Sequence, residues 1–373
     1  NTEIVDTLKR EKRLDAAGYR SLLESRDPDT AAYLHETAKG VSVQRFGRGI
    51  YIRGLIEFTN ICRNDCLYCG IRKSNRNIRR YMLADNEIID RCSCGYGLGF
   101  RTFVLQGGEL PDEKDDFIEE VCRLIHGRFP DCAITLSLGE RREESYRRFF
   151  NAGATRYLLR HETRNPGHYA RLHPADMSLE NRLRCMDWLK AIGYQTGTGI
   201  MVGSPYQSTD NIIEDIQYIR SLRPEMIGLG PFIPHRDTRF AGWYRETAFQ
   251  DANGNGDNTD GMTGNAGRNG REDRRMELTL KLISIFRLML PDALIPATTS
   301  LATIAPDGRE KGILSGANVV MPNLSPPGTR ASYSLYDGKA SHGSESAEGL
   351  AELESGLARI GYHIDFSRGD YSE

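Results

Sequence analysis

Short apolar runs alternate with amphipathic segments along most of the chain. The runs end in small or polar residues and cover 51–60, 102–108, 133–139, 155–162, 197–203, 225–232, 294–299 and 318–323. Helix-like segments lie between them, for example at 112–127, 143–153, 179–193, 209–222 and 277–290. A strand followed by a helix, repeated eight times, predicts an α/β fold of the (β/α)8 TIM-barrel type. A doubly wound open sheet is the alternative, but eight units over roughly 270 residues favour a closed barrel.

Three segments lie outside this repeat. Residues 1–44 predict an N-terminal helical extension, because their leucines form an approximate helical stripe. The barrel is assigned to 45–338, and 339–373 is expected to be a C-terminal helical tail. Residues 250–273 are dominated by Gly and Asn and predict a flexible surface insertion, since their aspartates do not have the spacing of an EF-hand loop.

Composition and charge exclude several classes of protein. The chain has 373 residues, 49 Lys+Arg and 51 Asp+Glu, and a formal net charge of -2. This balance lacks the basic field expected of a nucleic-acid-binding protein, and 39% hydrophobic residues exclude a disordered chain. No apolar run approaches the roughly 20 residues that span a bilayer. Residues 1–15 are charged, without the apolar core of a secretory signal.

Three clustered cysteines carry the strongest chemical signal. They lie directly after the first predicted strand, in the order Cys62-Arg-Asn-Asp-Cys66-Leu-Tyr-Cys69. A structural zinc site normally has four protein ligands, and a fourth at the usual spacing is missing. A [4Fe–4S] cluster takes one ligand per iron, so three cysteines leave one iron open. Zinc or incidental thiols remain the alternatives. Cys92 and Cys94 are expected to be buried thiols, and Cys122, Cys132 and Cys185 have no clustered partners.

An open iron can bind the amino and carboxylate groups of S-adenosylmethionine (SAM). An electron from the cluster would then cleave the carbon–sulfur bond and give a 5′-deoxyadenosyl radical. The cysteine spacing resembles that of the radical SAM superfamily. The resemblance places Tyr68 near the adenine, and Gln106, Gly107 and Gly108 at the methionine amine.

Polar residues also end the next predicted strands. Thr135, Ser137 and Glu140 end the third, and Arg160 and Glu162 end the fourth. Reactive groups of a barrel lie at the carboxyl ends of its strands, so we expect Glu162 to face the cavity. The alternative for Glu162 is an ion pair with Arg160 or Arg182 and no contact with a ligand.

Longer stretches resemble one family within this superfamily, the [FeFe]-hydrogenase maturases of the HydE type. They read IEFTNICRNDCLYCGIR, LSLGE, RYLLRHET, LENRL, GPFIPH, IPATT and GANVVMPN, and the resemblance runs from about residue 45 to 338. It implies that Cys62, Cys66 and Cys69 hold the cluster and that Glu162 and Arg182 bind SAM. It implies a cavity lined by the residues Thr135, Ser137, Arg160, Thr298 and Thr299. Met226 is expected near the adenosine, with plain core packing as the alternative.

The family also implies a substrate and partners. The substrate would be a small iron–cysteine–CO–CN precursor of the hydrogenase H-cluster, and the partners would be other maturases and an electron donor, with no nucleic acid and no membrane. A methylornithine synthase-like mutase acting on an amino acid and a zinc-stabilised scaffold without catalysis remain the alternatives. No Cys follows Cys185, so no second cluster is expected. We expect a cytoplasmic protein of an anaerobic setting, or an organellar one in a eukaryote.

Overall fold

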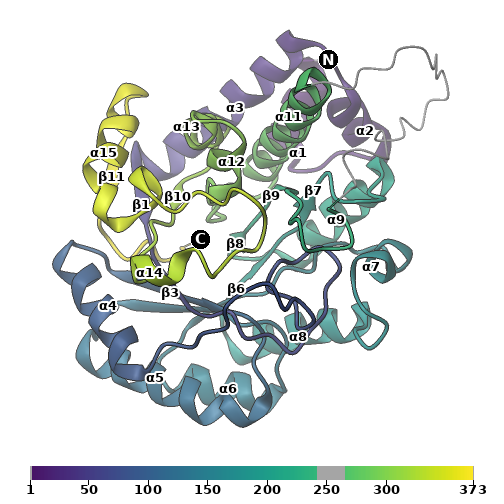
Figure 1. The fold of residues 1–373 in the computed structure, drawn as a ribbon. Coiled ribbons are helices and arrows are strands. Elements are labelled where there is room, and N and C mark those ends of the chain that lie inside the picture. The colour runs from purple at the N-terminus through teal and green to yellow at the C-terminus, as the bar shows by residue number, and fades with distance from the viewer. Residues whose placement is uncertain (1, 242–264, 373) are drawn as a thin grey trace.

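The fold is a parallel barrel surrounded by helices (Figure 1). The structure, a computed structural model, describes residues 2–241 and 265–372. Six consecutive strands form one parallel sheet in chain order. They are β2 (Gly54–Thr59), β3 (Thr102–Gly107), β4 (Ala133–Ser137), β5 (Arg156–Leu158), β6 (Gln195–Thr198) and β8 (Met226–Ile227).

Single bridges close this sheet into a ring. Met226 pairs with Leu294, Pro296 pairs with Val319 of β10 (Val319–Val320), and Leu55 pairs with Asn323. The residues at 294–296 and 319–323 therefore occupy the seventh and eighth strand positions. When the pairing register is followed round the ring from Glu57, it returns to Gly49, eight residues earlier. A shift of eight is the shear of a closed eight-stranded barrel. The predicted TIM barrel is confirmed.

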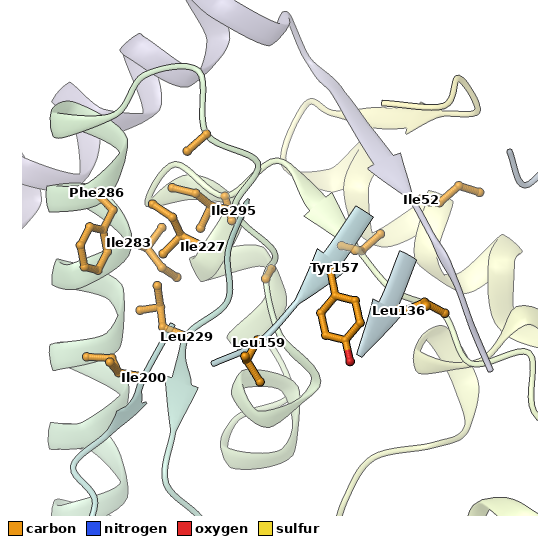
Figure 2. Close-up of a cluster of buried hydrophobic side chains, with 14 of the residues drawn as sticks. Ile52, Leu136, Tyr157, Leu159, Ile200, Ile227, Leu229, Ile283, Phe286 and Ile295 are labelled. Atoms are coloured by element: carbon orange, nitrogen blue, oxygen red, sulfur yellow. The ribbon is translucent and has the colours of Figure 1, made fainter. Parts of the chain in front are cut away.

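Side chains alternate between the two faces of each strand, and the outward set is apolar. Leu136, Tyr157, Leu159 and Ile227 are fully buried in one large cluster with helical residues such as Phe286 (Figure 2). The covering helices are α4 (Asp85–Gly97), α5 (Asp115–Arg128), α6 (Glu143–Asn151), α8 (Leu179–Ile192), α9 (Thr209–Leu222), α11 (Asn265–Met289), α12 (Thr299–Ile304) and α13 (Gly308–Leu314). Because the outer face carries this core, the inward positions are available for polar residues.

The N-terminal residues form three helices, α1 (Thr2–Glu11), α2 (Ala16–Glu24) and α3 (Pro28–Phe46). Helix α3 packs along α11, and α2 packs on α9. Asp15 and Asp27 cap α2 and α3, because their carboxylates accept hydrogen bonds from the free N–H groups of the first turn. Strand β1 (Gly49–Ile52) then continues into β2 and pairs with β10.

The C-terminal tail reaches both ends of the barrel. It follows α14 (Pro327–Arg330) and contains α15 (Leu350–Arg359) and a strand, β11 (His363–Asp365), which pairs with β1. The tail is therefore not purely helical. Asp370 then forms an ion pair of 2.6 Å with the buried Arg156, at the amino end of β5. A two-stranded extension, β7 (Met201–Val202) with β9 (Gly230–Pro231), and helix α7 (Pro166–Leu172) lie at the opposite end.

The predicted insertion at 250–273 lies outside the described residues as far as residue 264. Its last part belongs to α11, which begins at Asn265. Among the described residues, no helix is long and apolar enough to span a membrane.

Candidate functional site

The cysteine loop leaves β2 at the carboxyl end of the barrel. Its backbone is fixed to the neighbouring strand: the Arg63 N–H donates to the Glu109 carbonyl at 2.8 Å, and the Gly108 N–H donates to the Thr59 carbonyl at 3.0 Å. Gly108 lies so close that an added Cβ would overlap the Ile61 carbonyl oxygen and lie 2.8 Å from the Cys62 Cβ. Because the cysteine loop packs against it, position 108 requires a glycine.

The three thiols share one poorly solvated region. Burial raises the pKa of Cys62, and it raises the pKa of Cys66 well above the ordinary thiol value. Burial, followed by the charge of Cys62, raises the pKa of Cys69 to about 12. Three thiolates so close together need a positive partner, and metal ions deprotonate the thiols that bind them.

This donor set fits an iron–sulfur cluster better than a single metal ion. Within the described ranges, no group of three or more His, Cys, Asp or Glu side chains is placed to hold one ion. A cluster does not require such convergence, because each thiolate binds a different iron. All three cysteines are half-buried and outside any disulfide. Of the other five, Cys92 is buried as predicted, and Cys122, Cys132 and Cys185 are also buried. Cys94 is exposed, which corrects the prediction of a buried thiol.

Tyr68 lies between the cysteines and helix α7. Its hydroxyl is 3.3 Å from Nε2 of His173, and the two rings meet edge to face at 5.5 Å. Burial lowers the pKa of His173 to about 3, so this imidazole is neutral at physiological pH. His173 in turn stacks on Tyr169, at 3.9 Å between ring centroids. Tyr68 is thus held by a neutral aromatic group beside the loop.

The end of β3 supplies a polar side chain and a glycine pair. Gln106 is half-buried, pairs in register with Ser137 of β4, and donates from Nε2 to the Tyr333 hydroxyl at 3.3 Å. Gly107 packs against β2, since an added Cβ would lie 2.8 Å from the Thr59 Cγ2. Gly107 and Gly108 therefore lie against the end of β2 and the start of the cysteine loop, and the contact of this segment with the methionine amine stays a prediction.

A network of charged residues follows β4 and β5. Arg160 Nη2 donates to Glu162 Oε2 at 2.8 Å. Arg182 is buried, and it donates from Nε to Glu140 at 2.5 Å and from Nη1 to the Arg160 carbonyl at 2.6 Å. Glu109 links the network to the cysteine loop, because its carboxylate accepts from Arg63 at 2.8 Å. The structure therefore brings Arg160, Glu162 and Arg182 together near the cysteine loop. Glu162 forms an ion pair with Arg160, as the alternative prediction for this residue stated.

The backbone at Glu162 is in the left-handed region, with φ of 65°. A residue with a side chain adopts this conformation at a cost, so its surroundings must hold it. The adjacent His161 is completely buried, with Nδ1 2.8 Å from Thr198 Oγ1 and Nε2 3.2 Å from Asp215 Oδ1. The same Asp215 oxygen accepts from the Arg164 N–H at 2.5 Å. Asp215 therefore anchors the turn on both sides of Glu162.

Several polar atoms in the middle of the barrel and at its carboxyl end have no partner in the described structure. They are Thr135 Oγ1, Arg160 Nε and Tyr169 Oη, and all three atoms are buried. Unpaired buried polar atoms are costly, so they mark places where a polar ligand would be stabilised. Ser137 and Leu158 are half-buried although Leu136 and Tyr157 beside them are fully buried, so the upper interior is not filled by side chains.

Thr298 and Thr299 end the seventh strand position on the same side of the barrel. Thr298 Oγ1 donates to the Leu229 carbonyl at 3.1 Å and is 3.0 Å from Ser300 Oγ. Thr299 begins α12. Both residues are half-buried, in contrast to the fully buried Ile295 and Leu301 on either side.

Met226 does not lie near the cysteine loop. It packs with Leu294 and Val319 in a small buried cluster that Tyr371 of the C-terminal tail covers. Its Sδ accepts a hydrogen bond from Arg53 at 3.1 Å. This cluster lies at the amino end of the strands, because the barrel's shear places the start of β8 well below the end of β2. The structure supports the alternative, plain core packing, and not a contact with adenosine.

The sequence reasoning missed a buried ion pair inside the barrel. Glu57 of β2 is completely buried, binds the Lys339 ammonium, and accepts from Asn323 Nδ2 at 2.9 Å. Lys339 lies over the Tyr333 ring, 5.0 Å from its centroid. The signal was present as a Glu within an apolar strand, but its partner is 282 positions away in the chain. Local patterns do not reveal such a pairing.

Comparison with known proteins adds the family. A family model described as the Radical SAM superfamily matches residues 56–219. The [FeFe] hydrogenase maturase subunit HydE of Thermotoga maritima is 39% identical over 341 residues, which cover 90% of this chain and 88% of that protein. The 3-methylornithine synthase of Methanosarcina acetivorans is 26% identical, over 91% of this chain and 87% of that protein.

Solved structures show the same fold at lower identity. Methylornithine synthase (PylB) matches with a TM-score of 0.77 and 23% identity, over 97% of both chains. HydG, a maturase of the [FeFe]-hydrogenase, matches with a TM-score of 0.77 and 18% identity, over 98% of this chain and 75% of that one. By its near full-length similarity to HydE and its radical SAM match, the chain belongs to the HydE family of radical SAM enzymes, which use a [4Fe–4S] cluster and S-adenosylmethionine.

Proposed function

We propose that this enzyme acts in the assembly of the [FeFe]-hydrogenase H-cluster, and that Cys62, Cys66 and Cys69 hold its [4Fe–4S] cluster. The observation that carries the proposal is one loop of three half-buried, mutually interacting thiols at the carboxyl end of the barrel. When bound, the cluster and SAM together supply the electron and the radical source of this family.

The surrounding residues provide contacts for SAM. Gln106, Gly107 and Gly108 lie beside the loop, where backbone groups suit the methionine amine. Arg182 is a buried cation suited to the carboxylate, and Glu162 is suited to the ribose hydroxyls. Because Glu162 is paired with Arg160 at 2.8 Å, a bound ribose would share or replace that ion pair. Tyr68, fixed by His173, is suited to lie against the adenine.

The substrate we propose is a small iron–cysteine–CO–CN precursor in the upper barrel, with other maturases handling it before and after. Arg160 suits an anionic, cyanide-bearing ligand, because it stays charged and its Nε is buried without a partner. Ser137, Thr135, Thr298 and Thr299 add hydroxyl groups around the same interior. The setting would be reducing, as in the cytoplasm or an organelle of an anaerobe.

The test is cluster analysis followed by a maturation assay. Cys62→Ser, Cys66→Ser and Cys69→Ser should each lose iron, sulfide and SAM cleavage after anaerobic reconstitution. Cys94→Ser is the matched control, because Cys94 is exposed and far from the loop in sequence, and it should keep all three properties.

A hydrogenase maturation mixture lacking only this protein should then yield inactive hydrogenase, and adding the protein should restore activity. Full hydrogenase activity in its absence would contradict the proposed role. Turnover of lysine by the reconstituted protein would instead support the mutase alternative, and zinc without sulfide would support a scaffold.

A further inference from the structure

A strongly basic segment follows the third cysteine. Residues 60–80 contain six Lys or Arg and one Asp, although the whole chain carries a net charge of only -2. Five of these cations lie within 72–80, which reads RKSNRNIRR. Positive charge is therefore concentrated in this segment of a nearly neutral protein, and it should create a locally positive electrostatic potential.

The segment is attached directly to the cysteine loop. The Lys73 N–H donates to the Asn64 carbonyl at 2.8 Å, and the Arg72 N–H donates to the Cys69 carbonyl at 3.2 Å. Ser74 Oγ donates to Asp65 at 2.7 Å. Lys73 is four residues from Cys69, so the two Cα atoms are at most about 14 Å apart.

Arg80 holds the segment in this shape. Its Nη1 donates to the carbonyls of Asn60 at 2.5 Å and Ile71 at 2.7 Å, and its Nη2 donates to the Asn75 carbonyl at 3.0 Å. Burial lowers the pKa of Arg80, and the charges of Cys62 and Cys69 oppose that shift, which places the guanidinium within electrostatic range of both. Arg80 therefore has a structural role and is not part of the exposed surface.

Three cations of the segment have no such role. Lys73, Arg76 and Arg79 are exposed, and within the described residues none of their side chains forms an ion pair or a hydrogen bond. Arg63 and Arg72, by contrast, are paired with carboxylates. Exposed cations without acidic partners attract acidic macromolecules and accelerate their association.

We propose that Lys73, Arg76 and Arg79 form the docking surface for a small acidic electron-transfer protein that carries a flavin or an iron–sulfur centre. The inference rests on the proposed function, because it assumes that the adjacent cysteines hold the cluster. The donor is oxidised by one electron, and the cluster is reduced by that electron. All three side chains are exposed on the segment that follows Cys69, so a protein docked there would approach the cluster from the molecular surface.

The experiment compares two sources of electrons. The variant Lys73→Glu/Arg76→Glu/Arg79→Glu and the unchanged protein are reconstituted, and SAM cleavage is driven either by dithionite or by reduced flavodoxin, with a reduced ferredoxin as a second arm. With dithionite, the variant should cleave SAM as the unchanged protein does. With a reduced donor protein at low salt, its rate of SAM cleavage should be at least tenfold lower than that of the unchanged protein. The rate of the unchanged protein should fall as ionic strength rises, while that of the variant should change little.

Binding gives a readout that does not depend on turnover. The Kd for flavodoxin or ferredoxin, measured by titration calorimetry, should rise at least tenfold in the variant. The control Lys9→Glu/Arg10→Glu/Arg13→Glu reverses three exposed cations on α1 and the turn after it, and should leave Kd and rate unchanged.

Each other outcome has a distinct meaning. If neither donor binds the variant more weakly than the unchanged protein, the docking proposal is wrong. If the control loses as much as the variant, the effect is one of overall charge, and the proposal is also wrong. If the unchanged protein holds no cluster and does not cleave SAM with dithionite, the proposed function itself fails. If the variant loses its dithionite-driven cleavage, the milder Lys73→Gln/Arg76→Gln/Arg79→Gln variant and the calorimetric Kd decide the question.

Discussion

Replacement of Asp215 by Ala tests whether a buried group on α9 positions the end of β5. Asp215 is completely buried and its Oδ1 receives two contacts, from Nε2 of His161 at 3.2 Å and from the Arg164 N–H at 2.5 Å. Burial raises the pKa of Asp215, and the hydrogen bond from His161 opposes that shift. In Asp215→Ala, a buried imidazole and a backbone N–H both lose their partner.

The expected loss of stability is about 3–5 kcal/mol, the usual effect of removing one partner of a buried pair. The unfolding entropy is roughly 2.1 cal/mol/K per residue, or about 0.8 kcal/mol/K for a chain of this length. The melting temperature should therefore fall by about 4–6 °C. Because Glu162 follows His161 with φ of 65°, its carboxylate should also become less well positioned, and SAM should bind more weakly.

Thermal unfolding of the anaerobically reconstituted protein measures the first effect, and titration with SAM measures the second. Asp215→Asn should lose less, since its amide oxygen still accepts from the Arg164 N–H. The control Asp210→Ala removes a side chain of the same helix that is 72% exposed, and its solvent-exposed ion pair with Arg20 should contribute little to stability. A melting temperature for Asp215→Ala within 1 °C of the control, together with unchanged SAM affinity, would refute the reasoning.

Three further predictions concern other parts of the molecule. Gly108→Ala should lower the iron content of the reconstituted protein and its stability by about 1–3 kcal/mol, because the new Cβ would lie 2.8 Å from the Cys62 Cβ. The control Gly40→Ala adds a Cβ with nothing within 4 Å and should be neutral or stabilising. Equal iron content in the two variants would contradict the prediction. Lys339→Met should lower the free energy of unfolding by about 3 kcal/mol, because it leaves Glu57 buried without its counter-ion. Adding Glu57→Gln to the same chain should recover part of this loss, and thermal unfolding measures both variants. If the losses of the two single variants add in the double variant, the two residues do not act as a pair. Burial lowers the pKa of His35 from 6.5 to about 4, so its contribution to stability is present above pH 6.5 and is lost as the pH falls toward 4. The free energy of unfolding should therefore fall between pH 7 and pH 5, and His35→Gln should make that fall smaller by about 1–2 kcal/mol. An unchanged pH profile of stability in His35→Gln would show that this residue does not cause the fall.

The sequence alone determined the architecture and the cysteine loop. Eight apolar runs separated by amphipathic segments specify a barrel, because a parallel strand covered by a helix must be apolar on its outer face. The three cysteines specify their chemistry through residue type and spacing, which are local properties. The polar residues at the ends of β4 and β5 were predictable for the same reason, since the end of a strand is visible in the pattern.

The tertiary structure alone decided which distant groups meet. The chain does not show that Lys339 returns to Glu57, or that Asp215 reaches the turn at Glu162, because both pairings join elements far apart in sequence. It also moved Met226 from the expected SAM site to the amino end of the barrel. The shear of the closed sheet sets the height of each strand, and a run of apolar residues gives the strand but not its register with its neighbours. Residue type and spacing therefore fix local chemistry, whereas ring closure and long-range contacts fix where each group acts.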